Sequence, residues 1–154
     1  MEIRQGVEEM IDKFEGEYNF LSNFYPSPIT IDSITYPTVE HAFQAAKTRS
    51  FLKRIGISKL DTPGKAKRAG RQVELRSDWE KIKDQVMYDC LKEKFKIPDL
   101  KEKLFATGNE ELIEGTTWHD NYWGNCTCDK CKNIEGKNKL GKLLMRLREE
   151  LQNE

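Results

Sequence analysis

Three polar residues recur along one face of a predicted helix that begins near Val39, namely Glu40, Gln44 and Lys47. On a helical wheel they form a narrow row beside a separate apolar arc. A carboxylate, an amide and an ammonium in line supply an acid or base, a hydrogen-bonding group and a cation. The same row would also suit a solvated face, since a carboxylate such as Glu40 is favoured in a first helical turn. The pattern therefore allows two interpretations, the wall of a site and an exposed surface.

A second group of chemically capable residues is the segment Trp118-His-Asp-Asn-Tyr-Trp-Gly124. It has neither helical nor strand periodicity, so we expect a loop, and loops often carry function. Trp118 and Trp123 offer aromatic faces for a nucleobase, at about 1–3 kcal/mol per stacked base. Asp120 could bind a ribose hydroxyl or orient water. The alternative is structural, with both tryptophans in the core and Asp120 forming a turn.

Two further segments contain candidate binding residues. Asn23 and Phe24 lie in Phe20-Leu-Ser-Asn-Phe-Tyr-Pro26, which fits a tight turn nearly as well as the edge of a pocket. Lys67 and Arg71 belong to the early turns of a helix predicted to open at Thr62-Pro63. Cations are less favourable at that end of a helix, so we expect solvent or an anion beside them.

Three of the four cysteines lie together as Cys126-Thr-Cys128-Asp-Lys-Cys131. In a chain without an export signal, such cysteines are thiols or metal ligands more often than disulfides. They can supply three thiolates to zinc, with His119 as a fourth ligand, although the second paired-cysteine knuckle of common zinc modules is absent. A zinc ion bound here would be structural, because thiolate-rich closed sites usually are.

The composition indicates a charged, water-soluble domain. Charged residues make up 34% of the 154 residues, against about 25% in an average globular domain. The 26 basic and 26 acidic residues cancel, so nothing predicts long-range attraction to a polyanion. We expect no membrane span and, because the N-terminus lacks the apolar stretch of a signal peptide, a cytoplasmic protein.

The elements that must position these residues predict an α+β fold, a mostly helical single domain over residues 1–154 with a small antiparallel sheet formed by N-terminal strands. The helix starts rest on capping residues and prolines, and Ser77-Asp-Trp-Glu80 has the form of a capping box. Helices are expected at Ile3–Ile11, from Val39, from Pro63, from Ser77 to about Phe95, from Pro98 to just before Gly108, and from about Asn138. The last of these places Leu140, Leu143, Leu144, Leu147 and Leu151 on one apolar stripe. Strands are expected at Glu17–Phe24, Ile29–Ile31 and Ile34–Tyr36.

Six segments in order resemble the NADAR superfamily, which includes the YbiA-like N-glycosidases. They are SNFYPSPI, YPTVEHAFQAAK, AKRAGR, LFATGNEELIEGT, WHDNYWG and GKNKLGKLLMRLR, and they span about Phe20 to Arg148. The resemblance implies hydrolysis of a ribosyl C1′–nitrogen bond. One branch of the family acts on phosphoribosylamino-pyrimidine intermediates of riboflavin biosynthesis, and another removes ADP-ribose from the guanine amino group.

Site roles follow from the same resemblance. Glu40 occupies the glutamate of the family's E-H helix motif, and Asp120 and Trp123 occupy its D-x-x-W-G motif, which favours the site-wall interpretation. An oxocarbenium-like transition state calls for such a carboxylate, and a lysine could instead form a Schiff base with the opened sugar. The predicted catalytic residues are Glu40, Asp120 and Lys67. Lys47 is the other candidate amine, and a phosphate contact is the alternative role for Lys67. The predicted substrate-binding residues are Asn23, Phe24, Gln44, Lys47, Arg71, Trp118 and Trp123.

The leading hypothesis is a hydrolase that requires no cofactor and removes ADP-ribose from guanine in a nucleic acid or nucleoside. The riboflavin intermediates are the alternative substrates, and a non-catalytic module binding ADP-ribose or NAD is an alternative of another class. A zinc protein binding nucleic acid is disfavoured by the zero net charge. The implied partners are a ribosyl or ADP-ribosyl substrate and, functionally, an ADP-ribosyltransferase toxin, with no membrane.

Overall fold

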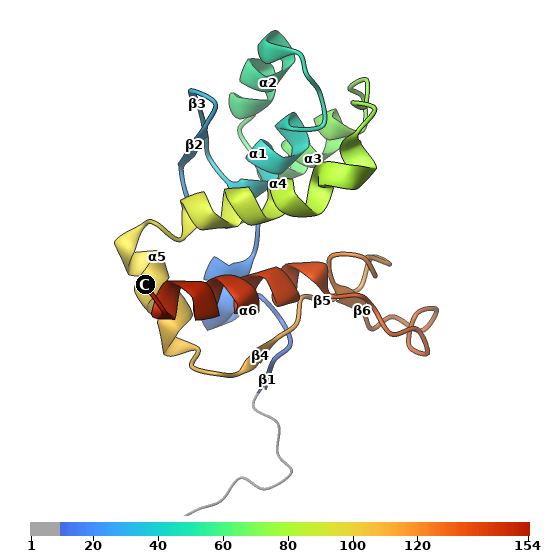
Figure 1. The fold of residues 1–154 in the computed structure, drawn as a ribbon. Coiled ribbons are helices and arrows are strands. Elements are labelled where there is room, and N and C mark those ends of the chain that lie inside the picture. Colours follow the sequence, from blue (N-terminus) through green and yellow to red (C-terminus); the bar gives the residue numbers. More distant parts are fainter. Residues whose placement is uncertain (1–9) are drawn as a thin grey trace, which may run out of the picture. The chain divides into compact units, whose positions relative to one another are not determined.

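The computed structural model describes residues 10–154, which fall into two compact units (Figure 1). One unit is Asn23–Lys101, and the other joins the chain up to Ser22 with Glu102–Glu154. Most of the helix expected at Ile3–Ile11 lies outside the described residues, and its last two residues form strand β1 (Met10–Ile11) instead. The single domain over residues 1–154 stays a prediction.

The unit Asn23–Lys101 contains the hairpin that the sequence predicted. Strands β2 (Ile29–Ile31) and β3 (Ile34–Tyr36) pair antiparallel, with Ile31 opposite Ile34. The two turn residues Asp32 and Ser33 have φ of 52° and 72°, as the favoured two-residue hairpin turns require. Asp32 is well suited to this position because aspartate tolerates the left-handed region better than most residues.

Four helices complete this unit: α1 (Val39–Ala45), α2 (Phe51–Ser58), α3 (Pro63–Gly70) and α4 (Trp79–Lys94). The predicted caps are confirmed for two of them, since Thr38 accepts from the His41 N–H and Thr62 from the Lys65 N–H, both at 3.1 Å. These bonds satisfy amide groups that have no partner within the helix.

The capping box predicted at Ser77 is wrong. The residue before α4 is Asp78, which makes no side-chain capping bond. Its carboxylate instead accepts from Arg76 Nε at 2.7 Å and Nη2 at 3.2 Å. A bidentate bond to a guanidinium is stronger than a neutral capping bond, and it takes the carboxylate away from the helix end.

In the other unit, the strand predicted at Glu17–Phe24 is also wrong. Residues Gly16–Leu21 form a 3₁₀ helix, which follows a positive φ of 60° at Gly16. The neighbours Phe20 and Leu21 are both buried. A strand would point successive side chains to opposite faces, whereas a tight helical turn places both on the core side.

The remaining elements of this unit are short strands and two helices. Strand β1 pairs in parallel with β4 (Glu111–Leu112), and β5 (Gly115–Thr116) pairs in parallel with β6 (Asn125–Cys126). Helix α5 (Pro98–Ala106) spans the boundary between the units in sequence, and Gly108 follows it with φ of 64°. Helix α6 (Lys139–Gln152) ends the chain.

The leucine stripe of α6 forms core, as its periodicity predicted. Leu140, Leu144 and Leu147 are at most 2% exposed. Gly141 lies against β4, because a Cβ at this position would overlap the Leu112 carbonyl oxygen. The α+β class with predominant helix is therefore confirmed. Within residues 10–154, every helix is too short or too polar to traverse a bilayer.

Candidate functional site

The polar row of α1 is buried, so the solvated-face interpretation is wrong for Glu40 and Gln44. Glu40 is 7% exposed and Gln44 is 5% exposed. Gln44 Nε2 donates to Glu40 Oε2 at 2.7 Å, across one helical turn. Burying a carboxylate is costly unless it is paired or hydrogen-bonded. The Gln44 amide supplies such a bond, and the role of Glu40 as a site residue stays a prediction.

Lys47 lies just past the end of α1, where its N–H donates to the Gln44 carbonyl at 3.2 Å. The pKa of Lys47 is lowered mainly by burial and further by the charges of Arg71, Lys67 and Lys83, while Glu40 opposes the shift. The amine and carboxylate therefore share one cationic environment. Lys83 belongs to α4, and sequence reasoning missed it because no local pattern connects α4 with α1.

Two buried amide oxygens accompany this row. Asn23 is 8% exposed, its backbone carbonyl accepts from the Glu40 N–H at 3.1 Å, and its Nδ2 donates to Met87 Sδ at 3.6 Å. Within the described part of the chain, Asn23 Oδ1 and Gln44 Oε1 have no hydrogen-bond partner. Buried acceptors are normally satisfied, so these two oxygens are exceptions within this unit. The neighbouring Phe24 is 44% exposed.

Helix α3 brings its cations to this row by close packing. Ala66 is fully buried, and a Cβ on Gly70 would overlap Gln44 Oε1, so only glycine permits this approach. Lys67 and Arg71 follow these two small residues and lie one turn apart on the helix. The predicted A-K-x-x-G-R motif is thus a packing surface with cations beside it. Lys65 has another role, since it pairs with Asp61 at 2.9 Å.

His41 connects α1 to the loop before α3 through a side-chain hydrogen bond. Its Nε2 lies 2.9 Å from the Leu60 carbonyl oxygen and its Nδ1 lies 2.8 Å from Thr38 Oγ1. A carbonyl only accepts, so Nε2 carries the proton and Nδ1 accepts from the Thr38 hydroxyl. Burial lowers the pKa of His41, opposed by the bond to Leu60.

In the other unit, Asp120 forms a turn. Its Oδ1 accepts from the N–H groups of Tyr122 at 3.1 Å and Trp123 at 2.9 Å. Thr116 Oγ1 donates to the Asp120 backbone carbonyl at 3.2 Å. These bonds correspond to the structural alternative for Asp120, while its catalytic role stays a prediction.

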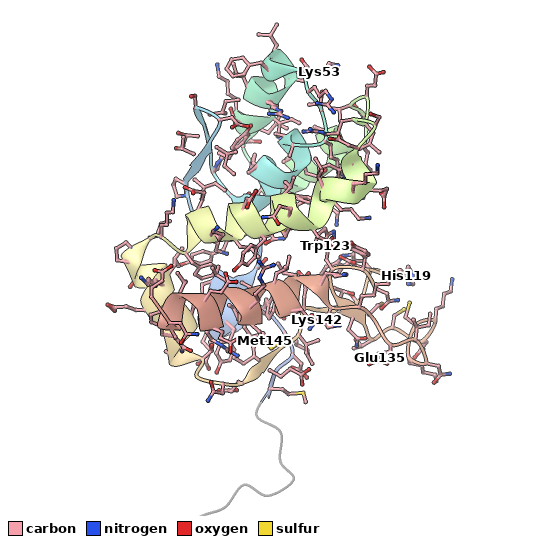
Figure 2. All side chains as sticks on the ribbon, in the orientation of Figure 1. Lys53, His119, Trp123, Glu135, Lys142 and Met145 are labelled. Carbon is pink, nitrogen blue, oxygen red and sulfur yellow. The ribbon has the colours of Figure 1, made fainter. Side chains whose placement is uncertain are left out.

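The aromatic residues of this loop differ in exposure. Trp118 is 53% exposed, so it is not a core residue. Trp123, labelled in Figure 2, is half-buried and packs edge-on against Tyr122 at a centroid distance of 4.8 Å. Trp118 also lines a groove of about 330 Å³ together with Asp12, Lys13 and other residues of this unit. The role of Trp118 in substrate binding stays a prediction.

The loop also completes the start of α6. The carbonyls of Asn121, Tyr122 and Trp123 accept from the N–H groups of residues 137, 139 and 140, at 2.8, 3.0 and 3.0 Å. These backbone bonds satisfy amides that a helix leaves unpaired at its N-terminus. Asn138 has φ of 49° and uses its side chain to bind strand β4, with Nδ2 donating to the Leu112 carbonyl at 2.9 Å.

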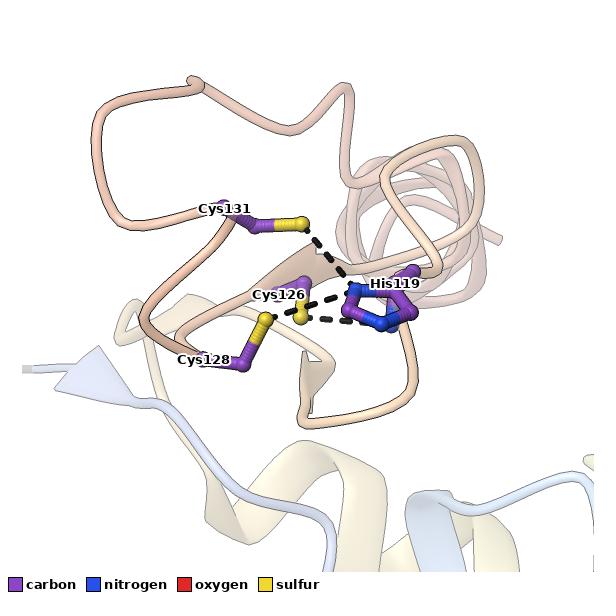
Figure 3. A group of neighbouring side chains, drawn as sticks. All are labelled: His119, Cys126, Cys128 and Cys131. Atoms are coloured by element: carbon purple, nitrogen blue, oxygen red, sulfur yellow. Dashed lines mark hydrogen bonds between the residues drawn. The ribbon is translucent and has the colours of Figure 1, made fainter.

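Next to this loop, His119 and three cysteines converge (Figure 3). His119 Nδ1 lies 3.3 Å from Cys128 Sγ and 3.4 Å from Cys131 Sγ. Burial opposes ionisation of Cys126, but hydrogen bonds from its neighbours, including the backbone N–H groups of Cys128 and His119, lower its pKa to about 6. Asn121 supports the group, because its side chain accepts from the Cys126 N–H at 2.8 Å and hydrogen-bonds to the Cys131 thiol.

The predicted site residues therefore form two groups. Asn23, Phe24, Glu40, Gln44, Lys47, Lys67 and Arg71 belong to one unit, and Trp118, Asp120, Trp123 and the three cysteines belong to the other. Within each group the structure brings together side chains that are distant in sequence. The residues that sequence reasoning did not identify, Lys83 and Asn121, act through neighbours in space.

Comparison with known proteins defines the class. The solution structure of the *Escherichia coli* protein YbiA superposes with a TM-score of 0.79 and 38% identity, covering 98% of this chain and 90% of that one. The fold is thus a YbiA-like α+β fold. A NADAR domain matches residues 11–152, and the chain belongs to the NADAR family.

Sequence relatives agree with this assignment. The N-glycosidase YbiA of *Escherichia coli* K12 is 42% identical over 138 residues, which are 88% of this chain and 82% of that protein. The N-glycosidase Npun_R5314 of *Nostoc punctiforme* is 37% identical over 88% of this chain and 87% of its own length. The riboflavin biosynthesis protein VVA0006 of *Vibrio vulnificus* is 34% identical over 95% of this chain, which matches 40% of that longer protein.

Proposed function

We propose that this protein is an N-glycosidase that hydrolyses a ribosyl C1′–nitrogen bond, with the removal of ADP-ribose from the guanine amino group as its leading activity. The observation that carries the proposal is the buried Glu40, hydrogen-bonded to Gln44 and beside the half-buried amine of Lys47. The names of its relatives, which are N-glycosidases at 37–42% identity, support the reaction class.

The reaction breaks the bond between C1′ and an exocyclic nitrogen and adds water, which gives the free sugar hydroxyl and the free amine. Positive charge develops at C1′ as the bond lengthens, and the Glu40 carboxylate stabilises it or accepts a proton from water. The cations Lys67, Arg71 and Lys83 suit the phosphates of the substrate. The Asn23 backbone carbonyl and the Gln44 side-chain amide position Glu40 through hydrogen bonds to its N–H and to its carboxylate.

A covalent route through an imine is the second form of this proposal. An amine attacks the opened sugar aldehyde only when it is unprotonated, so a lowered pKa favours the reaction. The position of Lys67 in the A-K-x-x-G-R motif of residues 66–71 favours Lys67 for this role, whereas the burial that lowers the pKa of Lys47 favours Lys47. Reduction with cyanoborohydride during turnover, followed by peptide mass spectrometry, identifies the lysine that carries the sugar.

The first test measures ADP-ribose release from an oligonucleotide ADP-ribosylated on guanine, using wild type, Glu40→Gln and Asp120→Asn. We expect at least a ~100-fold lower rate for Glu40→Gln, the scale of a lost acid or base. Glu149→Gln is the matched control and should keep the wild-type rate, because Glu149 is an exposed helical carboxylate outside the predicted site residues. A folded Glu40→Gln protein with full activity would refute the role of Glu40.

The second candidate substrate is a phosphoribosylamino-pyrimidine, which relatives named as riboflavin biosynthesis proteins favour. The same proteins are incubated with these intermediates, and ribose 5-phosphate release is measured. Release from the pyrimidine alone would replace the leading substrate within the same reaction class. Binding of ADP-ribosylated guanosine without release from either substrate would instead support a binding module.

A further inference from the structure

The four side chains of the cysteine-histidine group are arranged as ligands of a single ion. His119 Nδ1 and the Sγ atoms of Cys126, Cys128 and Cys131 all lie within 4.8 Å of one another. In a tetrahedral zinc site with Zn–S of ~2.3 Å and Zn–N of ~2.0 Å, neighbouring ligand atoms are about 3.5–3.8 Å apart. The measured N···S separations of 3.3 and 3.4 Å are close to this edge length.

We propose that these four atoms bind one zinc ion in a closed, structural Cys₃His site. Three thiolates and an imidazole in a tetrahedral arrangement select zinc over magnesium or calcium, which prefer oxygen ligands. Four protein ligands leave no open position for water or substrate, which is the arrangement of a structural site. The site does not depend on the proposed hydrolysis, because its ligands are separate from the predicted catalytic residues.

The backbone around the ligands is shaped to support this site. His119 has φ of 68°, in the left-handed region that histidine adopts infrequently. In this conformation its N–H donates to Cys126 Sγ at 3.2 Å while its ring faces Cys128 and Cys131. Asn121 binds both the Cys126 backbone and the Cys131 thiol. Hydrogen bonds to ligand atoms of this kind orient metal ligands in other proteins.

The position of the site in the chain indicates what the ion does. Its ligands close the segment between His119 and Cys131, and the intervening residues Tyr122 and Trp123 bind the first amides of α6. An ion at this position therefore ties the loop that contains Asp120 to the start of the last helix. In this role, zinc coordination stabilises the fold of a polar loop that has little apolar surface to bury.

The test measures metal in the full-length protein purified without a histidine tag. Inductively coupled plasma mass spectrometry should find about one zinc per chain in wild type, and Cys128→Ser and His119→Ala should lose most of it. Cys90→Ala is the matched control, because Cys90 is a buried thiol outside the group, and it should keep full zinc. His119→Cys should also retain zinc, since cysteine is an equivalent ligand.

A second measurement keeps the proposal testable if a variant fails to fold. Cobalt exchanged into wild type should give the intense visible bands of a tetrahedral ion and a thiolate charge-transfer band, and both should be weakened in Cys128→Ser. Rapid titration of the three clustered thiols without metal, a disulfide among these three cysteines, or iron in place of zinc would each overturn the assignment. Loss of hydrolysis in Glu40→Gln with full zinc separates this proposal from the proposed function.

Discussion

Two glycines in neighbouring helices should respond to alanine in opposite directions. Gly70 in α3 faces Gln44, and a Cβ added there would overlap Gln44 Oε1 and lie 2.8 Å from its Cδ and 3.1 Å from its Cβ. Gln44 Cβ is fixed to the backbone of α1, so the side chain cannot simply rotate away. Gly56 in α2 has nothing within 4 Å of an added Cβ.

The expected magnitudes follow from these contacts. Overpacking costs about 1–3 kcal/mol, and the displaced Gln44 loses its bond to the Glu40 carboxylate, a further ~1.5–3 kcal/mol. The better helix propensity of alanine returns about 0.5–1 kcal/mol. Gly70→Ala should therefore lower the free energy of unfolding by roughly 2–4 kcal/mol, or the melting temperature by about 5–15 °C. Gly56→Ala should raise the melting temperature by about 1–4 °C.

Differential scanning calorimetry and urea unfolding of the two variants and wild type measure these shifts. Hydrolysis by Gly70→Ala should also fall, because Gln44 and Glu40 move together. If Gly70→Ala melts at or above the wild-type temperature while Gly56→Ala behaves as expected, then α1 and α3 are not packed as described. The steric explanation of the A-K-x-x-G-R motif would then be refuted.

Other perturbations test the buried polar groups. Burial lowers the pKa of His41, so in the unfolded state this histidine binds a proton first, below about pH 6.5. The wild type therefore loses stability as the pH falls from there toward the folded pKa, and His41→Gln should lose less. Urea unfolding at pH 7.5 and 5.5 measures the difference. Arg148 is 6% exposed and donates to Thr107 Oγ1 at 2.7 Å and to the Glu110 carbonyl at 2.9 Å. Arg148→Met should therefore lower the free energy of unfolding by about 2–3 kcal/mol. Arg146→Met, at an exposed position, is the control, and equal melting temperatures for the two variants would contradict this account. Chelation of the proposed zinc should lower the melting temperature and speed proteolysis between His119 and Lys137, and unchanged cleavage would argue against a structural ion.

The sequence by itself determined the features that depend on residues a few positions apart. Thr38 and Thr62 cap their helices because the hydroxyl and the amide it binds are three residues apart. The hairpin turn follows from Asp32-Ser33 between two short alternating strands. The leucine stripe of α6 was readable because every member shares one face of one helix. The conclusion that Glu40 and Gln44 share one side of α1 has the same local basis, whereas Lys47 lies past the end of the helix.

Only the tertiary structure decided the features that depend on partners distant in the chain. Phe20 and Leu21 turn together into a core, where the alternation of a strand was expected. Helix α2 went unpredicted, and in the structure its Phe51 and Leu52 are exposed while Ile57 is its buried residue. The parallel strand pairs are only two residues long, too short to leave a period.

The features of the candidate site also divide into those predicted from the sequence and those decided by the tertiary structure. Sequence indicated the residue types: a carboxylate with an amide and an amine, an aromatic loop, and three thiols near a histidine. Folding decided that Glu40 and Gln44 are buried, that Lys83 joins Lys47, and that His119 faces Cys128 and Cys131. Burial and the convergence of charges are sums over many distant contacts, and those sums exist only once the chain has packed.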